Sequence, residues 1–449
     1  MRRILSQTEL QEILQSLLLS EEQQLAAAIA GAARELMDTH GLDRAVLLCG
    51  EPLRRIGALS AKALGAPLAL ACEDANLDLS RGLIVDMLFA AKDDGRRRGW
   101  IRAVKESGCP VLSVGVPAGV DPDTGRAADL SVYAQITLAP FGYLAGAFLQ
   151  DGLDHCGHIR PIGGESTEAE GVYRFEGSDA ARLLPPRKRT AHKGDSGKAL
   201  LCVGSSKYVG AALLSARACL AAGCGILFVA CPDQVRSALW RLPEAIGVPV
   251  GADWNKETSQ AAIRAMADMK AVGLGCGVGS GDVSSLIEAA LRSKLPLVLD
   301  ADGLNCLSRH RSLFSLLHDR VVLTPHPGEM SRLVQTPIDQ VRRDPIAVAQ
   351  KYAALWGCTV LLKGAATVVS DGKRTCLVAE GNAGLGKGGS GDVLTGIITG
   401  LLSQGIETYP AACLGSYLLG TSAEKAFGLL KERMLRASNV IEALEIWND

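Results

Sequence analysis

Short apolar runs alternate with polar, helix-like segments through the first part of the chain. The runs lie at residues 45–49, 67–72, 83–89 and 110–114, with 132–138 as a further candidate strand. Short apolar strands separated by helices are typical of a mostly parallel sheet whose two faces are covered by helices. The pattern therefore predicts an N-terminal Rossmann-like α/β/α sandwich.

The same alternation begins again near residue 199. Apolar runs predict strands at 199–203, 226–230, 271–274, 296–299 and 320–323, with a helix over 211–222 ended by Gly223. Three further runs, 360–363, 367–370 and 375–379, follow closely, and Asp371-Gly372 between the last two indicates a hairpin. Residues from Asp392 onward have largely helical periodicity. The second half is thus a second α/β unit with a doubly wound sheet.

A stretch rich in proline, glycine and charge separates the two halves. It covers residues 160–189, and we place the boundary near 175, which gives domains 1–175 and 176–449. Near the start, Leu10, Ile13, Leu14, Leu17 and Leu18 predict a one-sided helix over 8–19. That helix either packs on its own domain or faces a partner copy.

Composition narrows the class of protein. Hydrophobic residues make up 48% of the chain, enough for large cores, and the formal net charge is -1. A balanced charge gives no electrostatic reason to expect a nucleic-acid or membrane partner. No apolar run approaches the ~20 residues that span a bilayer, and the N-terminus lacks the apolar core of a signal peptide. We expect a soluble cytoplasmic protein.

The thirteen cysteines are expected to be buried free thiols of a reducing cytosol. Most of them stand in apolar runs, and none forms a C-x-x-C pair. The paired Cys and His ligands of a zinc site are missing, so the sequence predicts no zinc.

Polar or glycine-rich clusters follow nearly every strand of the second half. In a doubly wound sheet the ligand crevice lies beyond the carboxyl ends of the strands. We therefore expect these clusters to meet in one cleft although they are scattered in sequence. They cover residues 204–207, 275–279, 300–305, 324–329 and 363–364.

The densest glycine segment covers residues 381–392 and leads into an apolar helical pattern. Free N–H groups and the helix dipole at such a helix start stabilise phosphate. Asp392, in the first turn, could accept a proton from a substrate hydroxyl during phosphoryl transfer. The alternative is a purely structural glycine loop with Asp392 as an N-cap.

Together these motifs resemble the ADP-dependent NAD(P)HX dehydratase family, a ribokinase-like family of nicotinamide repair. The resemblance covers nearly all of residues 185–449. It is carried by His192-Lys193-Gly194-Asp195-Ser196-Gly197, Tyr208-Val209-Gly210-Ala211-Ala212, Asp300-Ala301-Asp302, Thr324-Pro325-His326-Pro327-Gly328-Glu329, Lys363-Gly364 and Gly388-Gly389-Ser390-Gly391-Asp392.

The resemblance implies dehydration of the S epimer of hydrated NADH or NADPH, with consumption of ADP, or alternatively ATP, and with Mg²⁺. It implies that Asp392 is catalytic and touches the hydrate together with Ala211, Gly277 and His326. It also implies that two segments hold the nucleotide, Lys363-Gly364-Ala365-Ala366-Thr367 and Gly388-Gly389-Ser390-Gly391. Members tend to assemble, which implies a homo-oligomer. One departure is Leu385-Gly386-Lys387, where Lys387 would add positive charge near the phosphates.

The N-terminal half resembles the NAD(P)HX epimerase domain that is often fused to the dehydratase. Asp86 and the turn Val116-Pro117-Ala118-Gly119-Val120-Asp121 fit, but the expected asparagine- and glycine-rich loop reads Glu51-Pro52-Leu53-Arg54-Arg55-Ile56-Gly57. Gly115 stands where an acidic residue is expected, and Leu144 where a lysine is expected. These losses predict a domain without epimerase activity, whose potassium site has gone except for Asp86.

Two rival functions remain open from the residues. The second half could be a kinase for a small molecule such as a vitamin precursor, since ribokinase-like folds share the glycine loop and the aspartate. The whole chain could instead be a non-catalytic nucleotide sensor.

Overall fold

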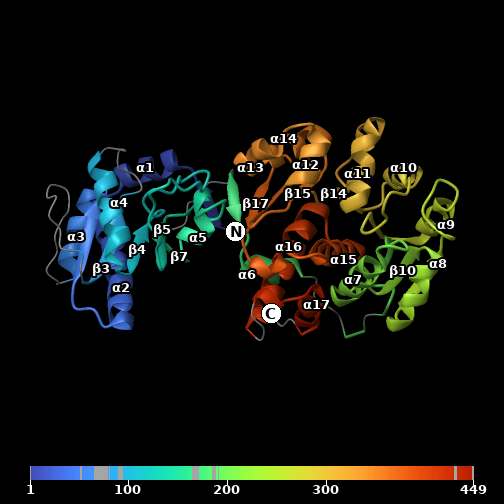
Figure 1. Cartoon of the computed structure of the whole chain (residues 1–449), viewed down its shortest axis with the longest axis horizontal. Coiled ribbons are helices and arrows are strands. Elements are labelled where there is room, and N and C mark those ends of the chain that lie inside the picture. The colour runs from blue at the N-terminus through green and yellow to red at the C-terminus, as the bar shows by residue number, and fades with distance from the viewer. Residues whose placement is uncertain are drawn as a thin grey trace. The chain divides into compact units, whose positions relative to one another are not determined.

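The computed structural model describes residues 2–50, 53–64, 79, 81–88, 95–163, 171–184, 189–190, 192–428 and 432–446. The chain divides into two compact units (Figure 1), Arg2–Arg174 and Phe175–Asp449, with Met1 grouped with the second. The predicted strand at 67–72 lies outside the described residues.

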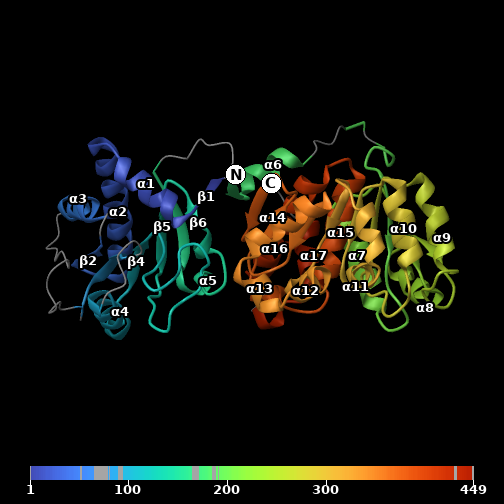
Figure 2. The same ribbon diagram turned by 90° about the horizontal axis from the view of Figure 1, so that it is seen from above.

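The N-terminal unit is built on a five-stranded parallel sheet in the order β2-β3-β4-β5-β7. Its strands are Ala45–Cys49, Leu83–Met87, Val111–Val114, Ile136–Pro140 and His158–Ile162. Val46, Leu48 and Ile84 on one face form a core with helix α4 (Gly95–Ser107). Helices α2 (Leu19–His40) and α3 (Arg54–Leu64) lie on the other side of these strands (Figure 2). This is the predicted sandwich of a sheet between helices.

This unit also has three short strands outside the five-stranded sheet, and the pattern did not predict the first of them. Strand β1 (Arg2–Leu5) pairs in parallel with β6 (Tyr143–Leu144) and antiparallel with β8 (Val172–Arg174). The expected helix over 8–19 is wrong at its end, because α1 covers Gln7–Ser16 and Leu17 and Leu18 are extended. The Glu21 carboxylate accepts a hydrogen bond from the Leu18 backbone N–H, and α2 starts there. A short helix α5 (Gly152–His155) completes the unit.

The C-terminal unit contains nine strands in the order β11-β10-β9-β12-β13-β14-β15-β16-β17. They are parallel from β11 to β15, and the last two are antiparallel. In chain order, β9 to β17 are Lys198–Cys202, Ile226–Cys231, Ala245–Pro249, Ala271–Leu274, Leu297–Leu299, Val321–Leu323, Thr359–Leu362, Thr367–Ser370 and Thr375–Val378. The predicted hairpin at Asp371-Gly372 joins β16 to β17, with Ser370 opposite Thr375.

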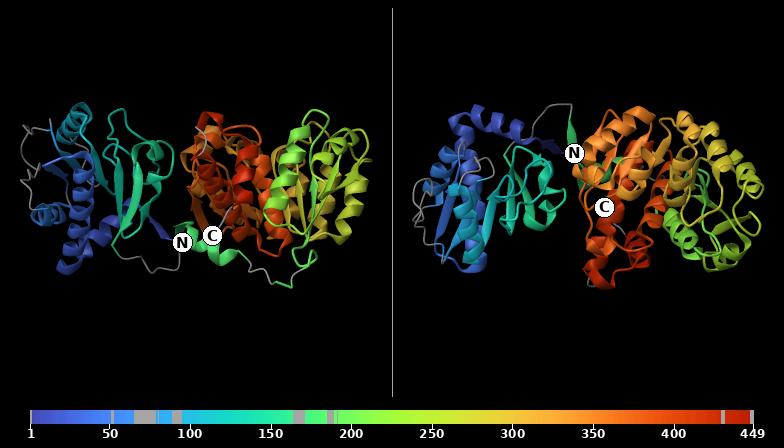
Figure 3. Two further views of the ribbon diagram at one scale, coloured as in Figure 1. Left: turned by 90° about the horizontal axis from the view of Figure 1, so that it is seen from below. Right: turned by 45° about the horizontal axis from the view of Figure 1, so that its top comes forward.

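Helices cover both faces of this second sheet, as Figures 1 and 3 show. One group packs through α15: α7 (Val209–Ala221), α15 (Ser390–Ser403), α16 (Thr408–Phe427) and α17 (Ala437–Glu445). The other runs along the opposite face: α9 (Ser259–Ala265), α10 (Ser284–Ser293), α11 (Ala301–Arg309), α12 (Pro327–Val334), α13 (Ile338–Arg343) and α14 (Pro345–Trp356). Two short helices, α6 (Gly177–Leu183) and α8 (Asp233–Arg236), lie at its margins. The doubly wound α/β fold is confirmed.

The order of the strands locates the ligand crevice. From β9, the chain adds β10 and β11 on one side and then β12 to β15 on the other, so the switch point lies between β9 and β12. Ligands of open α/β sheets bind beyond the carboxyl ends of the strands at such a point. There the Gly204 N–H donates to the Cys276 carbonyl at 2.8 Å and joins the two loops.

Two general expectations can be checked on the described residues. Eleven of the twelve cysteines in the described ranges are buried and Cys109 is half-buried, all as free thiols, whereas Cys72 falls outside them. Among the helices described, none has the length and apolar character to cross a membrane.

Candidate active site

The glycine-rich segment ends at the start of α15, as its sequence predicts. Gly389 is the N-cap residue, with a φ of 103°, a left-handed conformation that glycine adopts without steric cost. Asp392 lies in the first turn of this helix. Gly389 has no side chain to accept hydrogen bonds from the N–H groups of that turn, so the turn keeps donors for an anion.

Asp300 is the central acid of the site. It follows β13, its side chain is 2% exposed, and its Oδ1 accepts a 2.7 Å hydrogen bond from the Lys363 Nζ at the end of β15. The Thr395 hydroxyl, one turn beyond Asp392, donates to Oδ2 at 3.0 Å. A buried carboxylate needs such partners because desolvation alone strongly disfavours its charge. The ion pair thereby connects two strand ends to α15.

The His326 loop joins this network through Glu329. The Glu329 carboxylate is 6% exposed and its Oε2 lies 3.7 Å from the Lys363 Nζ. The same oxygen accepts from the His326 backbone N–H, while the His326 Nδ1 accepts from the Gly328 N–H at 3.0 Å. An accepting Nδ1 places the proton of the neutral ring on Nε2. Burial lowers the pKa of His326 against the opposite effect of Glu329.

The charges around Lys363 and Asp392 shift their pKa values in ways that suit phosphate chemistry. Burial on its own would lower the pKa of Lys363, but the Asp300 and Glu329 carboxylates outweigh it and the pKa is raised. Burial raises the pKa of Asp392 to about 6, and the negative charge of Asp300 adds to the shift. Asp392 is therefore ionised at neutral pH yet basic enough to accept a proton.

Gly391 brings the helix start against the ion pair. A methyl group at Gly391 would lie 3.3 Å from the Asp300 Oδ2 and 3.5 Å from the Lys363 Nζ. A methyl group at Gly388 would meet nothing within 4 Å. The structure thus brings together Lys363, Gly391 and Asp392 around Asp300, whereas Gly388 faces open space.

The other predicted nucleotide residues lie in the loop after β15. Gly364 and Ala365 are exposed, Ala366 is buried, and Thr367 opens β16. The predicted positive charge of Lys387 has two hydrogen-bond acceptors in the structure. Its Nζ donates to the Arg433 and Leu435 carbonyls at 2.6 and 2.8 Å, so it ties the glycine-rich segment to residues 433–435.

Two of the predicted substrate residues are in contact. Gly277 has a φ of 65°, and a methyl group there would come within 2.7 Å of the Ala211 side chain and 2.8 Å of the Tyr208 Cβ. Only glycine allows this approach of the loop after β12 to the start of α7. His326 belongs to the Glu329 and Lys363 network instead, and its side chain is half exposed.

A cavity of about 630 Å³ opens beside Gly277 at the switch point. The Ser205 hydroxyl in its wall is buried and has no hydrogen-bond partner among the described residues. Because buried hydroxyls usually have a hydrogen-bond partner, this group is a candidate to bind a ligand in the cavity. The Asp302 Oδ2 accepts from the Gly279 N–H at 2.7 Å and holds the rim. Other lining residues are Lys207, Tyr208, Asn305, Arg309 and Arg332.

Reasoning from the sequence missed several of these residues as individuals. Asp300 and Glu329 were only parts of polar clusters, and their central place depends on Lys363, 63 residues from Asp300. Glu329 did carry a local signal, since it follows His326 by three residues in a capping box. Ser205 was only part of the 204–207 cluster, and Thr395 had no signal, because its bond to Asp300 joins residues 95 positions apart.

Asp86, the acidic residue of the N-terminal unit that fits the epimerase pattern, is buried. Asp86 is 1% exposed, and its two oxygens accept from the Leu88 N–H, the Ser113 hydroxyl and the Ala118 N–H at 2.7–3.0 Å. Burial raises the pKa of Asp86 against these hydrogen bonds. Leu53, in the segment that replaces the expected loop, is fully buried, and α3 starts at Arg54. Leu144, at the lysine position, is 2% exposed.

Comparison with known proteins agrees with this geometry. Residues 199–444 match the family model described as NAD(P)H-hydrate dehydratase. The bifunctional NAD(P)H-hydrate repair enzyme of Vibrio cholerae is 34% identical over 352 residues, which cover 77% of this chain and 69% of that protein. The same enzyme of Moorella thermoacetica is 32% identical over 385 residues, covering 81% and 72%.

A solved structure is similar to the C-terminal unit. It is an ADP/ATP-dependent NAD(P)H-hydrate dehydratase from Bacillus subtilis co-crystallised with ATP and Mg²⁺, 28% identical with a TM-score of 0.54. The similarity covers 62% of this chain and 97% of that one. A ribokinase-like protein of Enterococcus faecalis, 24% identical with a TM-score of 0.55, shares the fold.

Proposed function

This chain belongs to the NAD(P)H-hydrate dehydratase family and is an enzyme of nicotinamide-nucleotide repair, and we propose that it dehydrates the S epimer of NADHX or NADPHX at the expense of ADP. The ring hydroxyl of the hydrate is a poor leaving group. Its oxygen attacks the terminal phosphorus of the nucleotide, the P–O bond to the remaining nucleotide breaks, and AMP leaves. The new C–O–phosphate bond then breaks to release phosphate, and loss of a ring proton restores the double bond of the dihydropyridine.

Asp392 is the base of the first step in this proposal. The hydroxyl proton moves to its carboxylate as the oxygen attacks phosphorus. A carboxylate with the ordinary pKa of about 4 would be a weaker base at neutral pH. The raised pKa of Asp392, about 6, keeps most of the side chain ionised while making it more basic.

The observation that carries the proposal is the convergence of Gly391, Lys363 and Asp392 around Asp300. The start of α15 supplies N–H donors for the transferring phosphate, and the Lys363 ammonium lies beside Gly391. We assign the nucleotide to Lys363–Thr367 and Gly388–Gly391. Asp300 is a positioning residue, because it holds the Lys363 Nζ at 2.7 Å from its own carboxylate.

The hydrate is assigned to the cavity at the switch point. Val278 and Gly279, directly after Gly277, line it, and the Ser205 hydroxyl can donate to a ligand. The Tyr208 ring is 43% exposed and offers a face on which a flat ring can stack. Lys207, Arg309 and Arg332 in the wall suit the negative pyrophosphate of a dinucleotide. His326 lies on the nucleotide side of this cavity by its link to Lys363 through Glu329.

Mg²⁺ fits the donors at this site. Magnesium prefers carboxylate, phosphate and water oxygens, and Asp392 and Asp300 are the acidic groups beside the glycine-rich helix start. Bound there with the nucleotide, it would neutralise phosphate charge.

We further propose that the N-terminal unit has no epimerase activity and no potassium site. The Asp86 carboxylate already accepts three hydrogen bonds, from two backbone N–H groups and one hydroxyl of the same unit. The asparagine loop, the acidic residue at Gly115 and the lysine at Leu144 are absent. The unit is then a structural partner of the dehydratase.

Two features support a cytoplasmic homo-oligomer. The free buried cysteines suit a reducing compartment. Leu18 and Leu19, at the junction of α1 and α2, are 67% and 57% exposed, which suits a contact with a second copy. Light scattering coupled to size-exclusion chromatography tests the assembly, and a monomer at micromolar concentration would contradict it.

The experiment that tests the proposal supplies the S epimer of NADHX with ADP and with ATP in parallel. Recovery of reduced nicotinamide absorbance with ADP, together with stoichiometric AMP, is the expected result. Faster recovery with ATP would show that ATP is the preferred co-substrate, and the assignment as a dehydratase would remain. If neither ADP nor ATP supports recovery of NADH, and the protein instead phosphorylates a vitamin-precursor alcohol, then the protein is a small-molecule kinase and not a dehydratase.

A further inference from the structure

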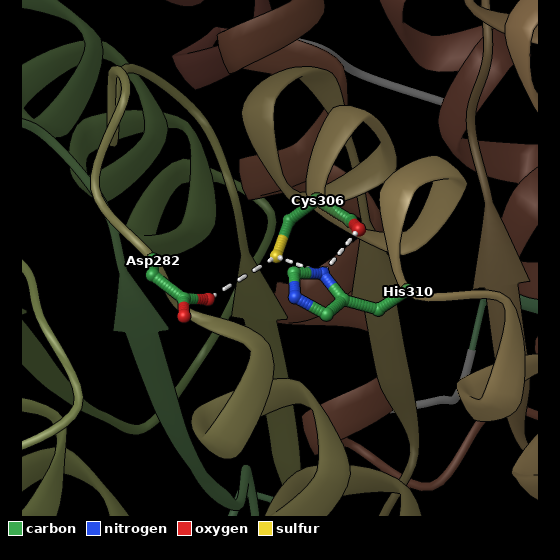
Figure 4. A group of neighbouring side chains, drawn as sticks. All are labelled: Asp282, Cys306 and His310. Carbon is green, nitrogen blue, oxygen red and sulfur yellow. Dashed lines mark hydrogen bonds between the residues drawn. The ribbon is translucent and has the colours of Figure 1, made fainter.

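Three potential metal ligands gather outside the reacting centre, between α10 and α11. Asp282 stands in the loop that follows β12, Cys306 lies on α11, and His310 ends that helix (Figure 4). The Cys306 Sγ is 3.9 Å from the Asp282 Oδ1 and 3.6 Å from the His310 Nδ1. One ligand atom from each residue lies within 4.8 Å of the other two.

The local backbone leaves one imidazole nitrogen open to a metal. The His310 Nδ1 is 3.0 Å from the Cys306 carbonyl oxygen, one helical turn before it. A carbonyl oxygen only accepts, so Nδ1 carries the proton and Nε2 keeps its lone pair. Figure 4 shows Nε2 on the edge of the ring that faces Asp282. Metal-bound histidines are commonly held in this way, with the second nitrogen donating to a carbonyl.

We propose that Asp282, Cys306 and His310 form a three-ligand site for a zinc-class divalent cation, with water as the fourth ligand. Zinc binds thiolate, imidazole and carboxylate together in a tetrahedron, whereas magnesium and calcium prefer oxygen alone. Zn–S bonds of about 2.3 Å and Zn–N or Zn–O bonds of about 2.0 Å bring ligand atoms to roughly 3.3–3.6 Å from one another. The Cys306 Sγ–Asp282 Oδ1 separation of 3.9 Å is close to those values, and one ligand atom from each residue lies within 4.8 Å of the other two.

The charges at the site balance a dication. The Cys306 thiol loses its proton when the zinc–sulfur bond forms. Thiolate and carboxylate together then carry two negative charges against the two positive charges of zinc. The Asp282 carboxylate is already oriented by the Ser284 N–H at 2.9 Å. Arg309 also acts on Asp282 and Cys306, and its charge opposes binding without occupying a ligand position.

A metal at this place would fix one wall of the proposed substrate cavity. Asp282 ends the loop that starts at Gly275 and carries Gly277 and Gly279, while Asn305 and Arg309 on α11 line the cavity. The Gly279 N–H bond to Asp302 joins this loop to α11 at the cavity rim. Zinc would add a second connection, with a structural role separate from the phosphoryl chemistry at Asp392. The proposal of a zinc site therefore does not depend on the proposed dehydratase function.

We predicted no zinc from the sequence because these three ligands do not follow a known zinc-binding spacing along the chain. Cys306 and His310 have C-x-x-x-H spacing on one helix, but Asp282 lies 24 residues earlier. Asp282 comes close to these two residues only because the loop after β12 packs against α11.

Competition against a chromophoric zinc chelator, with Zn²⁺ alone and the metal-free full chain, tests the site. One zinc per chain is expected for the unchanged protein and for Cys109→Ser, the control at the one half-buried cysteine of the described ranges. Cys306→Ser should weaken binding by more than about 100-fold, since losing a ligand exceeds the effect of losing a ligand's own hydrogen-bond partner. His310→Gln, at a partly exposed position, gives a second variant if Cys306→Ser folds poorly.

Cobalt supplies a direct signature of the sulfur ligand. Co²⁺ in place of zinc should give a thiolate-to-metal charge-transfer band that Cys306→Ser lacks and Cys109→Ser retains. Absence of one-to-one binding in the unchanged chain would overturn the site. So would equal zinc affinity in the unchanged chain, Cys306→Ser and His310→Gln, because the metal would then be held elsewhere.

Discussion

Two buried aspartates, one in each unit, show how differently the same residue type is used at the end of a parallel strand. Asp86 in the N-terminal unit has three donors, all from its own strand ends and turns. Asp300 in the C-terminal unit is equally buried, but it pairs with Lys363 and with Thr395 of α15, beside Asp392. The first carboxylate holds a fold together, and the second holds a cation and a helix start in position for a ligand.

Burial of an acidic side chain therefore does not by itself indicate a catalytic site. Both carboxylates avoid water, and both are satisfied by hydrogen bonds. What distinguishes the C-terminal unit is an additional acid, Asp392, whose pKa is raised to about 6, and an orphaned hydroxyl, Ser205, in a cavity nearby. Substitutions at these positions should distinguish a structural acid from a catalytic one.

The largest effect is expected for Asp392→Asn. Removal of a general base costs about 10²–10⁴-fold in rate, so kcat for dehydration should fall by that factor with little change in folding. The assay follows reduced nicotinamide absorbance with saturating ADP and the S epimer. Asp268→Asn, at an exposed acid before β12, is the matched control and should keep full activity.

A pH profile sharpens the same assignment. Because burial raises the pKa of Asp392 to about 6, kcat/KM should rise with pH through about 6 and level off above it. The rate rises with pH because Asp392 can act as a base only when its carboxyl group is ionised. A profile that is flat from pH 5 to 7.5 would remove Asp392 from the role of base even if Asp392→Asn is inactive.

Lys363→Met should cost the most stability. It leaves the Asp300 carboxylate buried without its cation, a change that typically costs about 3–5 kcal/mol. Urea denaturation should show this loss, and adding Asp300→Asn to Lys363→Met should recover much of it because the uncompensated charge is gone. If the double variant is no more stable than the single one, the ion pair is not what holds these strand ends.

Asp86→Ala should destabilise only the N-terminal unit. Three donors lose their acceptor, and each buried unsatisfied group costs about 1–3 kcal/mol. Hydrogen exchange of the amides at residues 113–118 should accelerate while dehydratase kcat stays unchanged. A parallel loss of kcat with protected amides would mean that Asp86 serves the reaction after all.

The smallest effect is expected at the glycines of the helix start. Gly391→Ala places a methyl group 3.3 Å from the Asp300 Oδ2 and 3.5 Å from the Lys363 Nζ, where the phosphate must approach. We expect KM for the nucleotide to rise by about tenfold, or about 1.4 kcal/mol of binding. Gly388→Ala meets nothing within 4 Å and is the control. Equal KM values for the two variants would move the phosphate away from Gly391.

Much of the fold was predictable because its signals are local. The strand runs at 199–203 and 271–274 and the Asp371-Gly372 hairpin depend only on neighbouring residues, and the structure has strands and a turn there. Strand β1 was missed because four residues with two arginines show no alternation, and only pairing with β6 and β8 makes them a strand. The α1 helix ended early since Leu17 and Leu18 fit the helical spacing but have extended backbones.

The site was predictable at its glycines and at Asp392, where motifs are continuous in sequence. Its charge network was not, because Asp300, Glu329 and Lys363 come from three different strand ends. The hydrogen bonds of Lys387 were not predictable for the same reason, since the Arg433 and Leu435 carbonyls that accept them lie over 40 residues away. Distance in sequence, rather than residue type, set the limit.

The most direct measurement of the difference between the two units compares pure R and S epimers of NADHX as substrates of the full chain with ADP. We predict rapid recovery of NADH from the S epimer and, from the R epimer, recovery only at the rate of uncatalysed epimerisation. Equally rapid recovery from both epimers would show that the N-terminal unit is an active epimerase, and it would contradict the assignment of Asp86 to a structural role.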